Sequence, residues 1–292
     1  MHYNIRISST VLFMLTLCTA ALAQPPCSVQ TIVGTWAASS QGTVFTTVSG
    51  NPVALPGAAL GIASITYDGR VSVNLDGIIG GRIAKSASQG TVTVNPDCTG
   101  VFEAPTPIPG FRLKENFAIH NNGDELWTIA ATGIQGNPAV WQCRWKRIAH
   151  VPLDLFQASS NCSADQLRGT WAGTFSGTVI LPGMPVPVPT GILYTGIVDS
   201  QGAMSGTFTS SVGGQVAIGG YTGSVVEVKS DCTGTWKWKL KAADGTELPG
   251  EGIEKIVVLD GGKEVWSLGL QGVLGIPIGL TRLERLSPAI PR

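Results

Sequence analysis

The sequence predicts an all-β protein, a tandem duplication of an eight-stranded antiparallel up-and-down β-barrel. Three observations support this prediction. The segment Cys27–Trp36, CSVQTIVGTW, returns at Cys162–Trp171 as CSADQLRGTW, so the chain contains two copies of one unit. Short runs of alternating apolar and polar residues follow in each copy, as in half-buried strands. Short connections with Gly, Asn or Asp join many of these runs, as in hairpins.

The two copies correspond well beyond their first ten residues. The run DCTG at residues 97–100 returns at 231–234, and ELW at residues 125–127 returns as EVW at 264–266. Two copies are too few to cover the core of a solenoid, so the repeat indicates two homologous domains.

The first 23 residues have the pattern of a secretory signal peptide. Arg6 provides a positive charge, Val11–Leu17 an apolar run, and Ala21-Leu22-Ala23 a cleavage site of small residues. No later segment approaches the roughly 20 apolar residues of a transmembrane helix. We expect an exported bacterial protein, secreted or periplasmic. Its predicted parts are one barrel at 24–149, a linker at 150–161 and a second barrel at 162–292.

The composition excludes partners that depend on strong positive charge. Only 13% of the residues are charged, against about a quarter in an average protein. Without the signal peptide, 18 basic residues face 19 acidic ones, which leaves a net charge of −1. Such a chain has no basic excess for nucleic acid or for an anionic membrane surface.

Five cysteines remain after removal of the signal peptide. An oxidising compartment favours disulfides between the two cysteines that both copies share. The predicted pairs are Cys27 with Cys98 and Cys162 with Cys232. Each would close a loop of about 70 residues and contribute roughly 4 kcal/mol of stability in the chain-entropy model.

In the first copy the alternation predicts eight strands, at residues 33–48, 60–67, 70–76, 83–95, 99–104, 112–120, 124–132 and 139–148. A matching set lies between residues 168 and 286. Consecutive antiparallel strands joined by short turns close into a barrel, which removes the exposed sheet edges. The interior of an eight-stranded barrel is either filled or holds one small ligand.

The connections between strands fall into two classes that alternate along the chain. Every second connection is a tight polar turn, and the others are longer, apolar and rich in Gly or Pro. The apolar ones are Gly50–Ala59, Gly77–Gly81, Pro105–Gly110 and Gly133–Pro138 in the first copy, and Leu181–Gly191 and Gly272–Gly279 in the second. Successive loops alternate between the barrel ends, so one end is predicted to be polar and held by the disulfide, and the other apolar.

The triplets at residues 34–36 and 169–171, both Gly-Thr-Trp, open the first strand of each barrel. They resemble the G-x-W signature of calycins, the superfamily of lipocalins, fatty-acid-binding proteins and avidins. The resemblance implies that Trp36 and Trp171 close the barrel floors and that Arg147 and Arg285 pack over them. It also implies a lipophilic ligand and no catalytic residue. The DCTG turns are similar to those of exported bacterial proteins of no established activity, and the allene oxide cyclase barrel is a structural alternative.

No motif for a metal, a cofactor or nucleophilic catalysis is present, so we expect a non-enzymatic protein without cofactor. The sequence has no C-x-x-C, H-x-x-x-H or G-x-S-x-G pattern. Cys143 is expected to be a buried spectator, since reactive thiols need electropositive, partly exposed surroundings. Glu125 and Glu264 each precede a Trp by two residues. They are either inward-facing acids with a raised pKa or, as we favour, strand-edge carboxylates paired with the backbone or Arg.

Six aromatic residues are candidates for a ligand-binding wall, with core filler as the alternative for each: Phe117, Trp127, Tyr194, Trp236, Trp238 and Trp266. Three functional hypotheses follow. The first is a barrel that binds a small hydrophobic molecule through its apolar loops. The second is a structural or adhesive envelope-associated protein with filled barrels, whose apolar loops contact another protein. The third is an isomerase or cyclase in which Glu125 or Glu264 assists.

Overall fold

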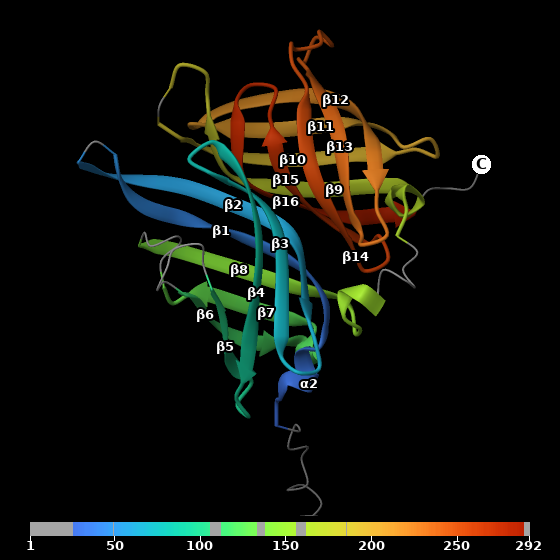
Figure 1. The fold of residues 1–292 in the computed structure, drawn as a ribbon. Helices are drawn as coiled ribbons and strands as arrows, with labels where there is room; N and C mark the ends of the chain where they lie inside the picture. Colours follow the sequence, from blue (N-terminus) through green and yellow to red (C-terminus); the bar gives the residue numbers. More distant parts are fainter. Residues whose placement is uncertain are drawn as a thin grey trace, which may run out of the picture.

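The computed structural model describes residues 26–48, 50–105, 112–132, 138–155, 162–184 and 186–288. They form two closed eight-stranded barrels in which consecutive strands pair antiparallel (Figure 1). The predicted fold class is therefore confirmed. The predicted signal peptide, most of the loops 105–110 and 133–138, and the end of the linker lie outside the described residues.

Each barrel begins with one short helical turn and continues through eight strands. The first barrel contains α2 (Val29–Ile32), β1 (Gly34–Val48), β2 (Asn51–Ile65), β3 (Arg70–Ile79), β4 (Arg82–Val94), β5 (Thr99–Pro105), β6 (Arg112–His120), η1 (Asn121–Gly123), β7 (Glu125–Ala130) and β8 (Ala139–Ala149). The second contains η2 (Ala164–Leu167), β9 (Gly169–Ile180), β10 (Val188–Val198), β11 (Ala203–Val212), β12 (Gln215–Val228), β13 (Thr233–Lys241), β14 (Gly252–Leu259), β15 (Glu264–Gln271) and β16 (Ile276–Pro288).

Two of the predicted apolar loops of the first copy are wrong, and both loops of the second copy are shorter than predicted, because β10 begins at Val188 and β16 begins at Ile276. Residues 51–59 belong to β2, which pairs with β1 from Gly34↔Ile65 to Val48↔Asn51. The prolines of this segment do not break it, because β3 joins β2 only from Gly57 onward and leaves the preceding residues with one neighbouring strand. Residues 77–79 likewise extend β3, and the chain turns at Gly80 and Gly81, whose φ angles of 56° and 81° suit glycine.

The floor of each barrel is built around the Trp of the Gly-Thr-Trp triplet. Trp36 is fully buried and its Nε1 donates to the Ile32 carbonyl at 3.1 Å. Trp171 repeats this bond with the Leu167 carbonyl at 2.7 Å. Gly34 has a φ of 149°, and a Cβ there would lie 2.3 Å from the Ala149 carbonyl oxygen. The first letter of the triplet is therefore fixed by backbone conformation and close packing.

Disulfides join the predicted cysteines at the same end of each barrel. Cys27 precedes α2 and bonds to Cys98 in the turn between β4 and β5, with 5.0 Å between the Cα atoms. Cys162 and Cys232 repeat the arrangement at 5.1 Å. Disulfides are typical of extracellular and periplasmic compartments. None of the helices in the described part of the chain has the length and apolar character of a membrane span.

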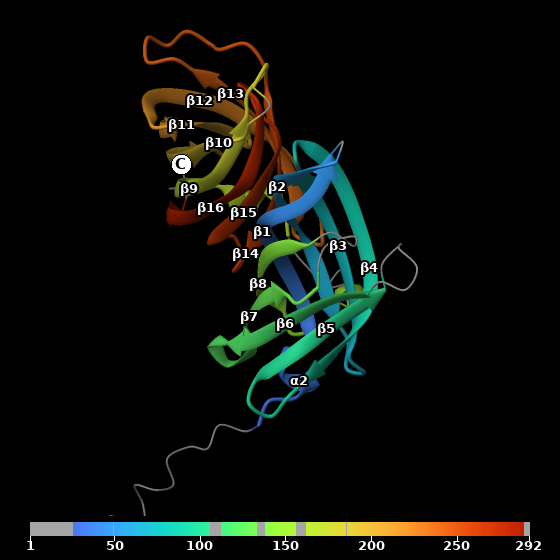
Figure 2. The same cartoon turned by 90° about the vertical axis from the view of Figure 1, so that its left-hand side faces the viewer.

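The two barrels lie against each other through their outer faces (Figures 1 and 2). Strands β1–β3 of the first barrel contact β14–β16 of the second, and an apolar cluster that includes Leu60, Ile78 and Leu268 fills the interface. Lys146 of the first barrel binds Asp260 and Glu264 of the second. The contact joins different faces of the two repeats, because β1–β3 correspond to β9–β11 and not to β14–β16.

Candidate functional site

The second barrel contains an internal cavity of about 640 Å³, which opens at the end opposite its disulfide. Residues of the predicted apolar loops, among them Leu181, Met184 and Val273, surround the opening. The walls are mainly apolar and include Phe175, Val179, Ile192, Phe208, Val212 and Pro277. Both the volume and this lining are typical of sites for small organic ligands, which occupy about 300–1,000 Å³.

The cavity ends on a group of aromatic side chains around one carboxyl group. Tyr194, Trp238 and Glu254 line its inner end, and they also border a smaller space of about 50 Å³ that reaches the floor residue Trp171. Tyr221 packs edge-on against Tyr194, with 6.2 Å between the ring centroids. The inner end therefore offers polar atoms at the bottom of an apolar chamber.

Glu254 is the acidic residue of this chamber, and only 8% of it is exposed. Its Oε2 accepts hydrogen bonds from Trp236 Nε1 at 2.8 Å and from Ser267 Oγ at 2.6 Å, and its Oε1 accepts from Trp238 Nε1 at 3.2 Å. Burial raises the pKa of Glu254, although the three donors oppose this shift. The carboxyl group is thus held in one position with an enhanced tendency to bind a proton.

Both tyrosines near Glu254 resist ionisation. Burial, followed by the nearby charge of Glu254, raises the pKa of Tyr221 to about 12. The same two causes, with Tyr221 added, raise the pKa of Tyr194 well above its ordinary value. Their hydroxyl groups therefore stay protonated at neutral pH and can donate hydrogen bonds.

The first barrel repeats the buried acid. Glu115 Oε2 accepts a hydrogen bond from Thr128 Oγ1 at 2.7 Å, and Cys143 Sγ lies 3.8 Å from both carboxyl oxygens. Burial raises the pKa of Glu115. Burial and then the charge of Glu115 raise the pKa of the Cys143 thiol well above its usual range. Cys143 thus has the surroundings of a spectator thiol, since reactive thiols need a lowered pKa.

Sequence reasoning missed Glu115 and Glu254, although two signals mark them. In β6, Glu115 alternates in phase with Leu113 and Phe117, so a period of two places a charged residue on the apolar face. In both copies the Glu also precedes its hydroxyl partner by 13 residues. A charged residue that recurs on the inner face of two homologous strands is a candidate for a buried acid.

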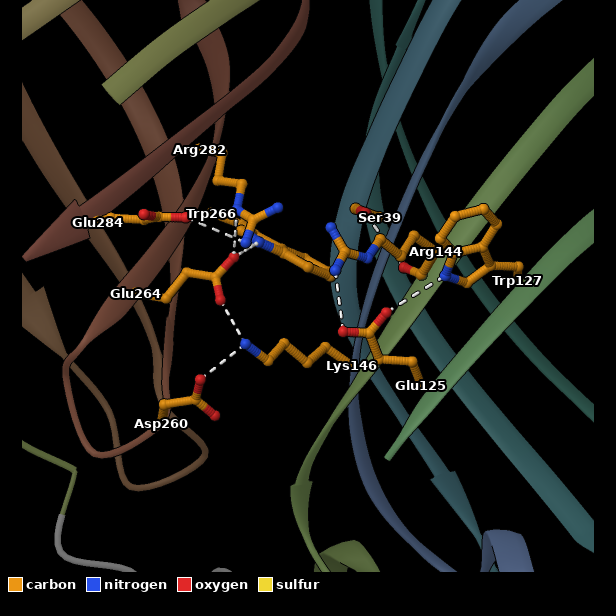
Figure 3. Close-up of polar contacts among 10 residues, drawn as sticks. All are labelled: Ser39, Glu125, Trp127, Arg144, Lys146, Asp260, Glu264, Trp266, Arg282 and Glu284. Carbon is orange, nitrogen blue, oxygen red and sulfur yellow. Dashed lines mark hydrogen bonds and ion pairs between the residues drawn. The ribbon is translucent and has the colours of Figure 1, made fainter. Parts of the chain in front are cut away.

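Glu125 and Glu264 lie on the outer faces of the barrels (Figure 3). Glu125 binds Arg144 at 2.9 Å and accepts from Trp127 Nε1 at 3.3 Å. Burial favours a higher pKa for Glu125, but the hydrogen bonds from Arg144 and Trp127 outweigh it and lower the pKa. Glu264 binds Arg282 Nε and Trp266 Nε1, each at 2.7 Å, as well as Lys146. Both acids therefore have the arginine partners that the favoured interpretation assigns to them.

The six aromatic candidates are divided among three environments. Tyr194, Trp236 and Trp238 lie at the inner end of the second barrel's cavity. Phe117 packs in the core of the first barrel. Trp127 and Trp266 point outward, where Trp127 is 55% exposed and Trp266 is buried against the first barrel. A ligand-binding role stays a prediction for the first three, and the other three are remote from this cavity.

No protein-family model matches the sequence, and no curated protein sequence matches it. Eleven chains of solved structures match this protein, and three of them are as follows. A protein from Nitrosomonas europaea with the provisional designation AttH is 8% identical, with 86% of this chain and 92% of that chain covered and a TM-score of 0.27. A protein of unknown function of the DUF3598 family from Nostoc punctiforme is 11% identical, with 88% and 97% covered and a TM-score of 0.20. An uncharacterised protein from Saccharomyces cerevisiae is 11% identical, with 86% and 98% covered and a TM-score of 0.22.

Proposed function

We propose that this protein is an exported, non-enzymatic β-barrel protein that binds one small hydrophobic molecule inside its second barrel. The observation that carries the proposal is the cavity of about 640 Å³ whose mouth is formed by apolar loops. A chamber of this kind removes apolar ligand surface from water, and each Å² removed contributes about 25 cal/mol to the free energy of transfer. The calycin resemblance implies the same class of ligand.

The inner end of the cavity favours a ligand with a hydroxyl or amine group. At this end, Glu254 offers carboxyl oxygens and Tyr194 offers a hydroxyl group. Among the described residues, no other part of the chamber combines a carboxyl group with aromatic hydroxyls. A ligand carboxylate at this position would lie beside another acid and lose its hydration, which costs free energy. We therefore expect long-chain alcohols and aromatic amines to bind more tightly than fatty acids of equal length.

The alternatives receive less support. A structural or adhesive protein with filled barrels does not require a chamber in the second barrel. An isomerase or cyclase that uses Glu125 or Glu264 requires these acids near the substrate, whereas both are engaged in ion pairs on the outer faces.

The test uses N-phenyl-1-naphthylamine, a neutral aromatic amine whose fluorescence rises in apolar surroundings. Titration of the purified protein is expected to give saturable uptake of one probe per chain, and dodecanol is expected to displace it better than dodecanoate. Uptake that does not saturate would overturn the proposal, and preferential displacement by dodecanoate would overturn the assignment of the polar group.

Two neighbouring substitutions locate the bound probe. Ser210 faces the cavity and is 8% exposed, so Ser210→Phe fills the chamber and is expected to abolish uptake. Ser211 is the next residue of β11 and faces outward, so Ser211→Phe adds the same side chain to the opposite face and is expected to leave uptake unchanged. Equal uptake by the two variants would place the probe outside the cavity.

A further inference from the structure

The barrels enclose a second concave surface, which lies between them on their outer faces. This inter-barrel cleft has a volume of about 1000 Å³. Strands β1 and β5–β8 line it from the first barrel, and β9, β15 and β16 line it from the second. The barrel wall separates the cleft from the cavity of the second barrel, so the two sites are independent.

Trp127 provides the large apolar surface of the cleft. It occupies the same place in the repeat as Trp266, because Trp127 pairs with Arg144 and Trp266 pairs with Arg282. Trp266 is 4% exposed because it packs against the first barrel, but Trp127 is 55% exposed. His120 supports the indole from β6, with 4.9 Å between the ring centroids. Packing between the barrels explains the indole of Trp266, but it does not explain the exposed indole of Trp127.

The residues around Trp127 differ from their counterparts around Trp266 in a consistent way. Asn116 replaces Lys255 and Gln142 replaces Leu280, as the strand registers show. Gln41 of β1 adds a third amide to the cleft. None of these three amides hydrogen-bonds through its side chain to another described residue. The cleft therefore combines an exposed indole with side chains that both donate and accept hydrogen bonds.

The charged groups of the cleft neutralise one another. Arg144 binds Glu125 at 2.9 Å and Arg282 binds Glu264 at 2.7 Å. Arg144 also lies over Trp266, with 5.7 Å from its Cζ to the ring centroid, and its buried Nε has no hydrogen-bond partner among the described residues. The cleft consequently has no excess charge to attract a phosphate or a polyanion.

From this combination we infer that the inter-barrel cleft binds a neutral carbohydrate. A pyranose ring has an apolar face of C–H groups and a rim of hydroxyls, each of which donates and accepts hydrogen bonds. The face of Trp127 matches the C–H groups, since an indole is a large amphipathic contact surface. The amides of Gln41, Asn116 and Gln142 match the hydroxyls. The length of the cleft along five strands of the first barrel suits an oligosaccharide better than one sugar.

The experiment is calorimetric titration of the full chain with three neutral hexasaccharides: cellohexaose, maltohexaose and N-acetylchitohexaose. Saturable binding of at least one of them is expected. Trp127→Ala should weaken that binding about tenfold or more, as truncation of an anchoring Trp does at other interfaces. Gln142→Ala should weaken it by a smaller factor. No binding of any of the three, or equal affinity in Trp127→Ala and the unmodified protein, would overturn the inference.

Tyr67 provides the control, because it is 62% exposed in the turn between β2 and β3 and does not line the cleft. Tyr67→Ala removes an exposed aromatic ring elsewhere and should not change carbohydrate affinity. Trp127→Ala should also keep full uptake of N-phenyl-1-naphthylamine, and Ser210→Phe should keep full carbohydrate binding. Loss of both ligands in either variant would mean that the two sites are not independent.

Discussion

The guanidinium of Arg147 lies over the indole of Trp36, with 4.5 Å from its Cζ to the ring centroid. Arg285 repeats the contact over Trp171 at 5.1 Å. The two arginines differ in their hydrogen bonds. Arg147 donates to the carbonyls of three residues, Thr31, Val33 and Gly123. The buried Nε and one terminal nitrogen of Arg285 have no partner in the described part of the chain. One arginine therefore ties several segments together, and the other mainly covers its Trp.

This difference predicts unequal effects of the same substitution in the two barrels. Arg147→Met leaves buried carbonyl groups without donors and should lower the free energy of unfolding by about 3 kcal/mol. Arg285→Met loses the cation–π contact but orphans no carbonyl, so its cost should be about 1 kcal/mol. Urea unfolding of both variants measures these values, and equal losses would contradict the assigned roles.

The buried acids predict how stability depends on pH. Burial raises the pKa of Glu254 and of Glu115 in the folded chain, whereas an unfolded Glu ionises near pH 4.3. At a pH between the unfolded and the folded pKa of such an acid, the folded state binds more protons than the unfolded state. The stability from each acid is therefore fully present below about pH 4.3 and is lost as the pH rises through the folded pKa.

Glu254→Gln removes this titration from the second barrel, and Glu115→Gln removes it from the first. Each variant should show a smaller decline in unfolding free energy between pH 4 and neutral pH than the unmodified protein. The two reductions should add in the double variant, because the acids lie in different barrels. Parallel pH curves for all four proteins would mean that neither acid has a raised pKa.

The surroundings of Cys143 predict an unreactive thiol. Its pKa is raised well above the usual range by burial and by Glu115, so almost no thiolate forms at pH 8. In a chain that starts at Gln24, Ellman's reagent should detect no thiol in the native state and one in denaturant. A Glu115→Gln variant should give the same result, since burial alone keeps the thiol protonated. Rapid labelling of the native protein would contradict the raised pKa of this thiol.

The contact between the barrels predicts a role for Lys146. Burial lowers the pKa of Lys146 in isolation, but hydrogen bonds to Asp260 and Glu264 more than offset this effect and raise it. Lys146→Ala leaves the buried Glu264 with one cation fewer and should destabilise the protein by about 2 kcal/mol. Lys114→Ala removes a solvent-accessible pair with Glu103 and should cost less than about 1 kcal/mol. Denaturation of the two variants under identical conditions provides the comparison.

The repeat was sufficient to predict both barrels and the cysteine pairs, because these features depend on residues that recur at the same spacing. The floors were predicted from the resemblance of the Gly-Thr-Trp triplets to the calycin signature. The length of β2 was not predictable in the same way. Its first half, Asn51–Pro56, contains two prolines and little alternation, and only backbone pairing with β1 makes it a strand. Local sequence does not report a register that a neighbouring strand imposes.

The candidate site was predicted in part. Tyr194, Trp236 and Trp238 share the inner face of the second barrel, as alternation along their strands implies. The sequence could not distinguish Trp266 from these three residues. Trp266 is buried by contact with the first barrel and not by the interior of the second barrel. Contacts between two domains depend on which outer faces meet, and no period within a strand contains that information. The cleft was missed for the same reason.

The packing of two repeats through unlike faces has a consequence for assembly. Such a contact is open at both ends, and a non-closing contact of this kind generates filaments when further copies add to it. The strand registers show which residues correspond in the two repeats. Glu284 of the second repeat corresponds to Lys146 of the first, and Glu125 of the first repeat corresponds to Glu264 of the second. A further copy added in the same way would place Glu284 against Glu125. Within one chain, the equivalent contact is between Lys146 and Glu264. Repulsion between these carboxylates opposes polymer growth.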